Sequence, residues 1–204
     1  MQENKYKVTK EEAQRLMQIP GNVKGAVILA DLEYVRRKGG KEAQKMIQKR
    51  LKELGYNISL EDIKPMDLYP EALSVLIILL AREVLELDEN GIFEMGKAAP
   101  KLSLFIKLLT RFFLSIKKCF EEAPKYWRRH FNFGELEAVE FNEKEKYVII
   151  RVKGYKFHPL MCHYHKGYFL EIAQMALGKR PVEIKETKCV FKGDPYHEYL
   201  ITWQ

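Results

Sequence analysis

Four side chains in the last quarter of the chain have types and spacing that suit a metal ion: Cys162, Glu186, Cys189 and His197. If a β-hairpin is centred on Gly193, Cys189 and His197 are equally far from the turn and lie opposite each other. Cross-strand Cβ atoms are about 4.5 to 5.5 Å apart, so a thiolate and an imidazole can reach one ion with bonds of about 2.0 to 2.3 Å. The spacing therefore predicts a hairpin that presents two metal ligands.

The other two candidate ligands, Cys162 and Glu186, reach the same ion only if a helix start and a strand bulge bring them there. Cys162 lies at the start of a predicted helix, where the helix dipole favours the thiolate form. Glu186 is three residues before Cys189, so on an ideal strand their side chains point to opposite faces, and a bulge or twist between them is required. Two sulfurs, one nitrogen and one carboxylate oxygen suit tetrahedral zinc, and four protein ligands leave no open position for catalysis. The prediction is a structural zinc site, although on spacing alone the ordinary burial of two small thiols explains the pattern slightly better.

The elements that must position these residues follow from the apolar periodicity, which changes from helical to strand-like after Gly134. Before it, the spacing predicts helices over 9–16, 23–35, 41–54, 70–87 and 101–120, with a break at Gly39-Gly40, a turn at Asn90-Gly91 and a short helix ending at Pro100. After it, the pattern predicts strands over 135–141, 146–153, 182–191 and 196–203, and a helix over 159–177. We expect an α+β fold, in which a helical N-terminal half precedes an antiparallel four-stranded sheet (β-β-α-β-β) with helices on one side. The predicted division is a helical region, 1–100, and a ligand-binding domain, 101–204.

Composition limits the class of protein. The 204 residues, 47% of them apolar, can bury a sizeable core, and three cysteines are too few for a disulfide framework, which indicates a reducing cytoplasm. The net charge of +7 comes from lysines and arginines spread among 28 acidic residues, so we expect a solvated surface and no nucleic-acid partner. The N-terminus is too polar for a signal peptide, and the apolar run Ala72 to Ala81 is shorter than the ~18 residues that span a membrane.

The segment from Lys101 to Phe120 carries a broad apolar stripe that core packing explains and that also suits the wall of a pocket. If the protein binds a small apolar or aromatic ligand, we expect the ligand to enter between this helix and the sheet. The expected pocket residues are Phe105, Leu109, Phe112, Phe113, Ile116 and Trp127.

The metal-ligand pattern resembles a known signature. Vinyl-reductase-like ligand-binding domains typically show Cys-x-Tyr-x-x-Gly, then Glu-x-x-Cys, then Gly and a final Cys. The run Cys162 to Gly167, the run Glu186 to Cys189 and Gly193 match this order, and His197 stands in place of the final Cys. In sensory domains of aromatic-responsive transcription activators that share the signature, the matching residues bind zinc beside a small-molecule pocket. The resemblance, over roughly 123–203, favours a zinc-stiffened sensor that signals through a protein partner as a homodimer, since no output domain follows Gln204.

A looser likeness covers the front of the chain. Lys24-Gly25, the run Leu32 to Val35, Gly39 and Tyr69-Pro70 resemble the opening of haem nitric-oxide-binding (H-NOX) domains, whose fold is related. Those domains need a proximal histidine on the long helix and a Tyr-x-Ser-x-Arg motif. The segment 101–120 contains no histidine and the motif is absent, so haem is not expected.

Three other functions remain as alternatives. One is a haem-dependent NO or O2 sensor of the H-NOX type, and another is an acyl-chain-binding adaptor like the related TRAPP subunits. A vinyl-reductase subunit ranks last, because the chain has no nucleotide-binding loop and no iron-sulfur cysteine set. No nucleophile pairs with a base on sequence grounds, so we expect no enzymatic activity. His130 is expected to be structural or on the surface.

Overall fold

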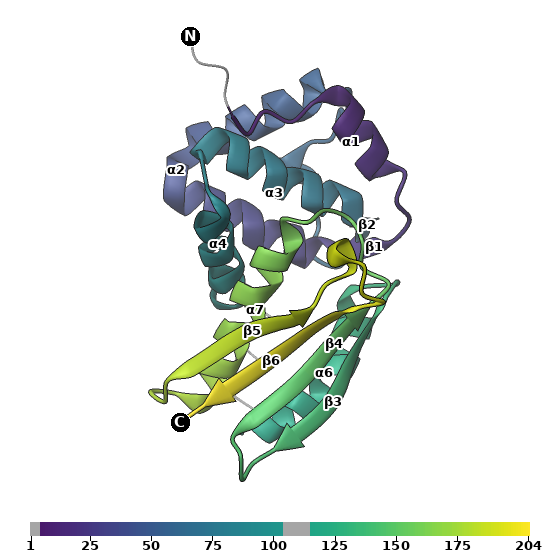
Figure 1. The fold of residues 1–204 in the computed structure, drawn as a ribbon. Coiled ribbons are helices and arrows are strands. Elements are labelled where there is room, and N and C mark those ends of the chain that lie inside the picture. Colours follow the sequence, from purple (N-terminus) through teal and green to yellow (C-terminus); the bar gives the residue numbers. More distant parts are fainter. Residues whose placement is uncertain (1–4, 104–114) are drawn as a thin grey trace.

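The computed structural model describes residues 5–103 and 115–204, which form a helical body and, below it, a sheet with two helices behind it (Figure 1). The α-helices are α1 Lys10–Met17, α2 Gly25–Glu53, α3 Glu71–Leu85, α4 Glu89–Leu102, α6 Ile116–His130 and α7 Met161–Leu177. Two short 3-10 helices span Leu60–Asp62 and Val190–Lys192. The strands are β1 Asn22–Lys24, β2 Leu68–Pro70, β3 Glu135–Asn142, β4 Tyr147–Lys153, β5 Val182–Lys188 and β6 His197–Trp203.

The C-terminal sheet has the strand order β3-β4-β6-β5, and every neighbouring pair is antiparallel. Helix α6 packs on β3 and α7 packs on β5, so both helices cover one face (Figure 1). The alternation that predicted the strands is visible in β4, where Val148, Ile150 and Val152 are buried and their neighbours are half-buried. The α+β class and the β-β-α-β-β order are confirmed.

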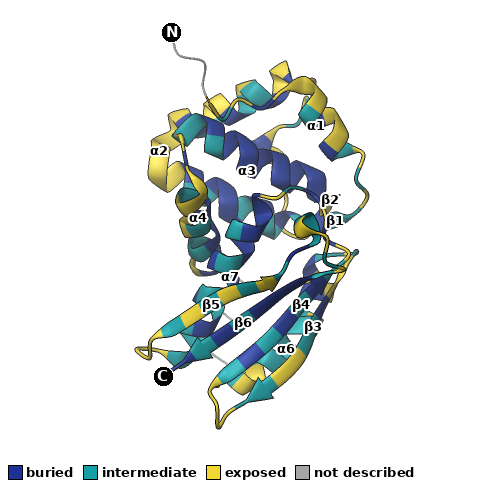
Figure 2. Ribbon diagram, in the orientation of Figure 1, coloured by how far each residue is buried: buried dark blue, intermediate teal, exposed yellow. Residues whose placement is uncertain are grey.

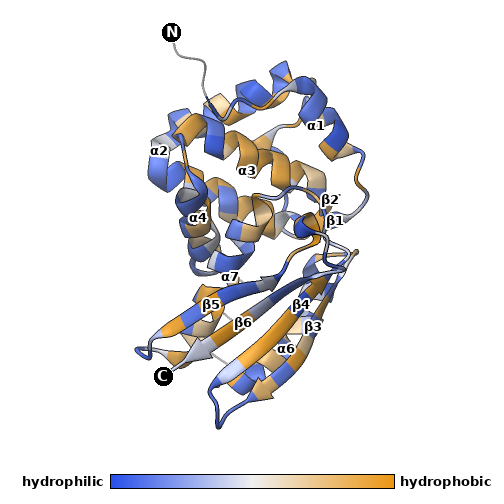
Figure 3. Ribbon diagram, viewed as in Figure 1, coloured by the Kyte–Doolittle hydropathy of each residue, from blue (hydrophilic) through white to orange (hydrophobic). Residues whose placement is uncertain are grey.

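Helix α3 forms the centre of the helical body. Figure 2 shows it buried along nearly its whole length, and Figure 3 shows that it is also the most apolar helix there. A helix that is apolar on all sides must be covered on all sides, and α1, α2 and α4 cover it. The predicted break in α2 is present as a kink at Gly40, which has a φ of 71° that favours glycine. In the part of the chain that the structure describes, no helix is long and apolar enough to cross a membrane.

Two predictions about the N-terminal half were wrong. The region was expected to contain only helices, but β1 and β2 pair there as a small antiparallel ribbon. Strands of three residues are too short to show an alternating pattern. Asn90-Gly91 was expected to be a turn, but it lies in the first turn of α4, where the carboxylate of Asp88 accepts a hydrogen bond from the Gly91 N–H. Asp88 is an N-cap that starts a helix, and the Asn-Gly pair follows it.

The expected continuous helix over 101–120 was also wrong. Helix α4 ends at Leu102, and Ser103 and Ser115 both have extended backbone angles. The hydroxyl of Ser115 accepts a hydrogen bond from the Lys118 N–H and so starts α6, which continues to His130, well beyond the predicted end. The aromatic stripe suggested one amphipathic helix, but the capping serines divide the segment.

Helices α4 and α7 cross with their backbones in close contact. A Cβ atom at Gly167 would lie 2.0 Å from the carbonyl oxygen of Phe93, and one at Gly96 would lie 2.0 Å from that of Tyr164. Only glycine permits this approach. The crossing joins the two halves of the chain, whose buried residues form one apolar core. The proposed boundary near residue 100 stays a prediction.

We expect Gly167→Ala to destabilise the protein by about 3 kcal/mol, because the methyl group forces the two helices apart. Urea unfolding measures the change. Gly178→Ala is the control: this glycine has a φ of 68° but nothing within 4 Å, so only backbone strain, about 1 to 2 kcal/mol, is expected there. Equal losses in the two variants would contradict the close crossing.

Candidate metal centre and adjoining cavity

The structure brings the four predicted metal ligands together. One ligand atom from each of Cys162, Glu186, Cys189 and His197 can be chosen so that all lie within 4.8 Å of one another. The two Sγ atoms are 3.5 Å apart, and the Cys162 Sγ is 3.8 Å from the His197 Nδ1. The same nitrogen is 3.4 Å from the Glu186 Oε1. Tetrahedral ligands with bonds of about 2.0 to 2.3 Å are separated by roughly 3.3 to 3.8 Å, so these distances suit zinc.

The second hairpin positions two of the ligands as the spacing predicted. Lys188 pairs with Glu198, and continuing this register places Cys189 opposite His197. The register shifts between Glu186 and Lys188, which is the bulge that the sequence argument required. Asp194 closes the turn after Cys189: its carboxylate accepts from the Cys189 N–H at 2.8 Å, and its own N–H donates to the Cys189 carbonyl at 3.2 Å.

The contacts around the cluster orient the imidazole. The Nε2 of His197 lies 3.0 Å from the Tyr155 carbonyl oxygen, to which it can only donate, so in a neutral imidazole Nδ1 is the lone-pair atom, and it faces the Cys162 thiol. A histidine ligand held in this way by its second nitrogen is typical of protein metal sites. His197 is 1% exposed and the Glu186 Oε1 atom has no hydrogen-bond partner, so the centre is buried and has unused acceptor capacity.

The acidity of Cys162 differs from the sequence-based expectation. This residue lies in the first turn of α7, as predicted, but burial and the nearby Glu186 carboxylate raise the pKa of its thiol well above the ordinary value. The free cluster therefore holds a neutral thiol, and a bound cation must displace its proton.

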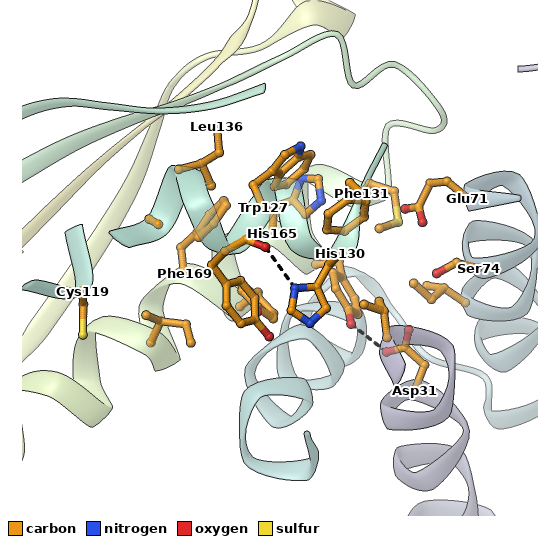
Figure 4. Close-up of a pocket in the computed structure, with 18 of the residues that line it drawn as sticks. Asp31, Glu71, Ser74, Cys119, Trp127, His130, Phe131, Leu136, His165 and Phe169 are labelled. Atoms are coloured by element: carbon orange, nitrogen blue, oxygen red, sulfur yellow. Dashed lines mark hydrogen bonds between the residues drawn. The ribbon is translucent and has the colours of Figure 1, made fainter. Parts of the chain in front are cut away.

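A cavity lies next to the metal cluster, between α2, α3, α6 and α7. The described side chains line a partly open space of about 130 Å3. For comparison, an engineered apolar cavity of about 150 Å3 holds one benzene molecule. Figure 4 shows Asp31, Glu71 and Ser74 along one side, and Trp127, His165 and Phe169 along the other. Most of the wall is apolar, and its apolar members include Val27, Ile78, Trp127, Phe131, Leu136 and Phe169.

Two buried carboxyl groups line this apolar cavity, and each accepts a hydrogen bond from a tyrosine. The Tyr164 hydroxyl donates to the Asp31 Oδ1 at 2.7 Å, and the Tyr155 hydroxyl donates to the Glu71 Oε1 at 2.6 Å. The second oxygen of each carboxyl group is buried without a partner. Burial raises the pKa of Asp31 to about 7 and that of Glu71 to about 8.

Two histidines also line the cavity, and neither supplies a positive charge. Burial lowers the pKa of His165 to about 3, and its Nδ1 has no partner. Burial also lowers the pKa of His130, which lies in contact with the Tyr126 carbonyl. The prediction that His130 is structural is consistent with its position, but it is also part of the cavity wall.

The pocket predicted from the sequence overlaps this cavity only in part. Trp127 lines it. Ile116 begins α6 and packs against the core, away from the described lining. The other four expected residues, Phe105, Leu109, Phe112 and Phe113, lie outside the described residues.

The sequence argument missed Asp31 and Glu71. A signal was available for Asp31, which shares one helical face with Ile28 and Val35, both fully buried. Glu71 occupies the first turn of a helix that is otherwise apolar, next to Ala72. An acid on an apolar helical face is an informative exception, because buried carboxyl groups are rare unless they are paired.

Known structures resemble this architecture closely. An H-NOX protein from S. oneidensis, described in the Fe(II)NO ligation state, superposes with a TM-score of 0.69 over 89% of this chain and 99% of its own, at 12% identity. The fold is that of H-NOX domains. An unliganded Fe(II) H-NOX protein from K. algicida gives a TM-score of 0.59 at 12% identity, over 89% of this chain and 96% of its own. An oxygen-binding H-NOX domain related to soluble guanylate cyclases gives a TM-score of 0.63 at 12% identity, over 89% of this chain and 95% of its own.

The H-NOX likeness rests on the fold, since identity is this low. No family model matches the sequence, and no curated protein matches it either. The resemblance of the front of the chain to H-NOX domains is thus confirmed for its fold. The vinyl-reductase-like and TRAPP resemblances stay predictions.

Proposed function

We propose that this protein is a small-molecule sensor that binds a ligand of about the size of benzene in the cavity between α2, α3, α6 and α7. The cavity itself carries the proposal: an apolar space deep in an H-NOX fold, with unpaired polar atoms of Asp31, Glu71 and His165 in or at its wall. An apolar cavity with a few convergent polar groups is the usual form of a ligand site. The proposal includes no catalytic step, and the signal passes to a protein partner.

We further propose that the cluster of Cys162, Glu186, Cys189 and His197 holds a structural zinc ion. The donor distances and the orientation of His197 support it. Cys162 lies in the first turn of α7, while Met161, Tyr164 and His165 of the same helix end line the cavity. Zinc at this position would tie α7 to the β5-β6 turn and hold one wall of the cavity in place.

Ligand binding can be tested by thermal unfolding with a set of benzene-sized compounds. We expect at least one to stabilise the protein by about 2.7 kcal/mol at a hundredfold excess over its Kd. Ala123→Leu, which places a larger side chain in the cavity wall, should abolish the effect. Ala176→Leu on α7, outside the cavity lining, is the matched control. Stabilisation that survives Ala123→Leu would place the ligand elsewhere.

Haem-dependent gas sensing is a second candidate, favoured by the ligation states of the H-NOX neighbours. These neighbours count against the expectation that haem is absent. The space bounded by the described residues, about 130 Å3, is smaller than the pockets of about 300 to 1,000 Å3 that drug-sized ligands use. Any axial histidine among the described lining residues would have to be His130 or His165. The absorption spectrum separates the candidates: a Soret band of stoichiometric intensity would establish haem, and a fatty acid retained in native mass spectrometry would favour the acyl-chain adaptor.

A further inference from the structure

The two carboxyl groups in the cavity wall have no charged partner that explains their burial. Asp31 is 1% exposed and Glu71 is 2% exposed. The tyrosine hydroxyls satisfy one oxygen of each, and the Asp31 Oδ2 and Glu71 Oε2 remain without hydrogen bonds. No lysine or arginine faces either group in the part of the chain that the structure describes, and the negative charge of Asp31 further raises the pKa of Glu71. Groups buried in this way cost stability unless something else satisfies them.

In their ionised form, the two carboxylates suit a partner that donates hydrogen bonds and carries positive charge. A carboxylate accepts only, and the neutral histidines of the wall add no positive charge. An ammonium group offers three donors, which is enough for both free oxygens, whereas a hydroxyl offers one donor and an anion is repelled. The rest of the wall is apolar and includes the aromatic rings of Trp127 and Phe131, which stack 4.2 Å apart. An aromatic or alkyl body of benzene size suits that surface.

We propose that the cavity binds a small primary amine, whose ammonium group lies between Asp31 and Glu71 and whose apolar body packs against Trp127 and its neighbours. This inference rests on the proposed function of the cavity as a ligand site and adds the chemical class of the ligand. The two acids are the residues that select it. Binding must draw both carboxyl groups into their charged form, so protons leave the protein as the amine enters.

The test compares benzylamine with two neutral compounds of similar shape, benzyl alcohol and toluene. Isothermal titration with the wild-type protein at about pH 8 should show benzylamine binding at least about tenfold more tightly than either neutral compound. The ammonium group of benzylamine can form charge-assisted hydrogen bonds with the two carboxylates, which neither neutral compound can form. Titrations in two buffers of different ionisation enthalpy should show protons released with benzylamine and none with toluene.

The variant Asp31→Asn, Glu71→Gln keeps both side-chain shapes and keeps an oxygen for each tyrosine hydroxyl. We expect it to lose at least about tenfold in affinity for benzylamine while its affinity for toluene changes less than about threefold. Asp62→Asn, at an exposed acid, is the control and should bind benzylamine like the wild type. Because the compounds are also compared on the wild-type protein, the test stands even if the double variant folds poorly.

Each outcome is decisive. Tighter binding of toluene or benzyl alcohol than benzylamine overturns the amine inference and leaves the cavity as a ligand site. Benzylamine binding that is unchanged in the double variant places the amine elsewhere and also overturns it. If none of the three compounds binds, the amine inference is overturned. The sensor function is then decided separately, by testing the set of benzene-sized compounds on the wild-type protein and on Ala123→Leu.

Discussion

Cys162→Ser and Cys189→Ser will each be purified with less than a tenth of the zinc of the wild-type protein, which itself will carry about one ion per chain. Both thiols face the same point as the His197 Nδ1, so either substitution removes a soft ligand from a four-membered set. The folded protein also loses the stability that the ion contributes, about 4 kcal/mol when free zinc exceeds its Kd a thousandfold. Elemental analysis and urea unfolding measure the two effects.

The third cysteine provides the control. Cys119 lies on α6, outside the cluster, and burial raises the pKa of its thiol to about 11. Cys119→Ala should keep the full zinc content. If Cys189→Ser retained wild-type zinc, Cys189 would not be a ligand, and the cluster would be two buried thiols packed beside a histidine.

Replacing Asp31 by Asn and Glu71 by Gln will make the protein more stable at high pH. Burial raises the pKa of Asp31 from 3.8 to about 7 and that of Glu71 from 4.5 to about 8, so the folded state holds protons that the unfolded state releases. The wild-type protein therefore loses stability as the pH rises from about 4 to about 8. A pKa change of one unit corresponds to about 1.4 kcal/mol.

We expect the double variant to gain up to about 9 kcal/mol over the wild type at pH 9 and little at pH 4, measured by urea unfolding without ligand. The amides cannot ionise, and each can still accept the hydrogen bond from its tyrosine, Tyr164 or Tyr155. Asp62→Asn, at an exposed position, should follow the wild-type pH profile. A double variant that is less stable than the wild type at pH 9 would show that the carboxylates are satisfied in the folded protein.

The approach of Cys189 and His197 could be predicted from sequence because the local geometry of the hairpin fixes it. A hairpin of known centre sets which residues face each other, and the required bulge near Glu186 follows from the two-residue period of a strand. The cavity could not be predicted in the same way. Asp31 meets Tyr164 across 133 residues and Glu71 meets Tyr155 across 84, and no local pattern encodes such pairings.

The segment before α6 shows a different limit. Apolar spacing over 101–120 is compatible with one amphipathic helix. Ser103 and Ser115 instead mark the end of one helix and the start of another. Ser115 is a strong N-cap residue, so its backbone leaves the helical region even though apolar residues continue on both sides. Periodicity indicates where a helix is favourable, and caps decide where it begins.

Tyr155 gives the two sites a common residue. Its carbonyl accepts the hydrogen bond from His197, and its hydroxyl donates to Glu71. A shift of this tyrosine would change the orientation of His197 and the position of Glu71 in the cavity wall together. If the ion and the amine both favour one position of the ring, each strengthens the binding of the other by the same factor, because linkage is reciprocal. Cellular zinc would then set the concentration at which this protein responds to its ligand.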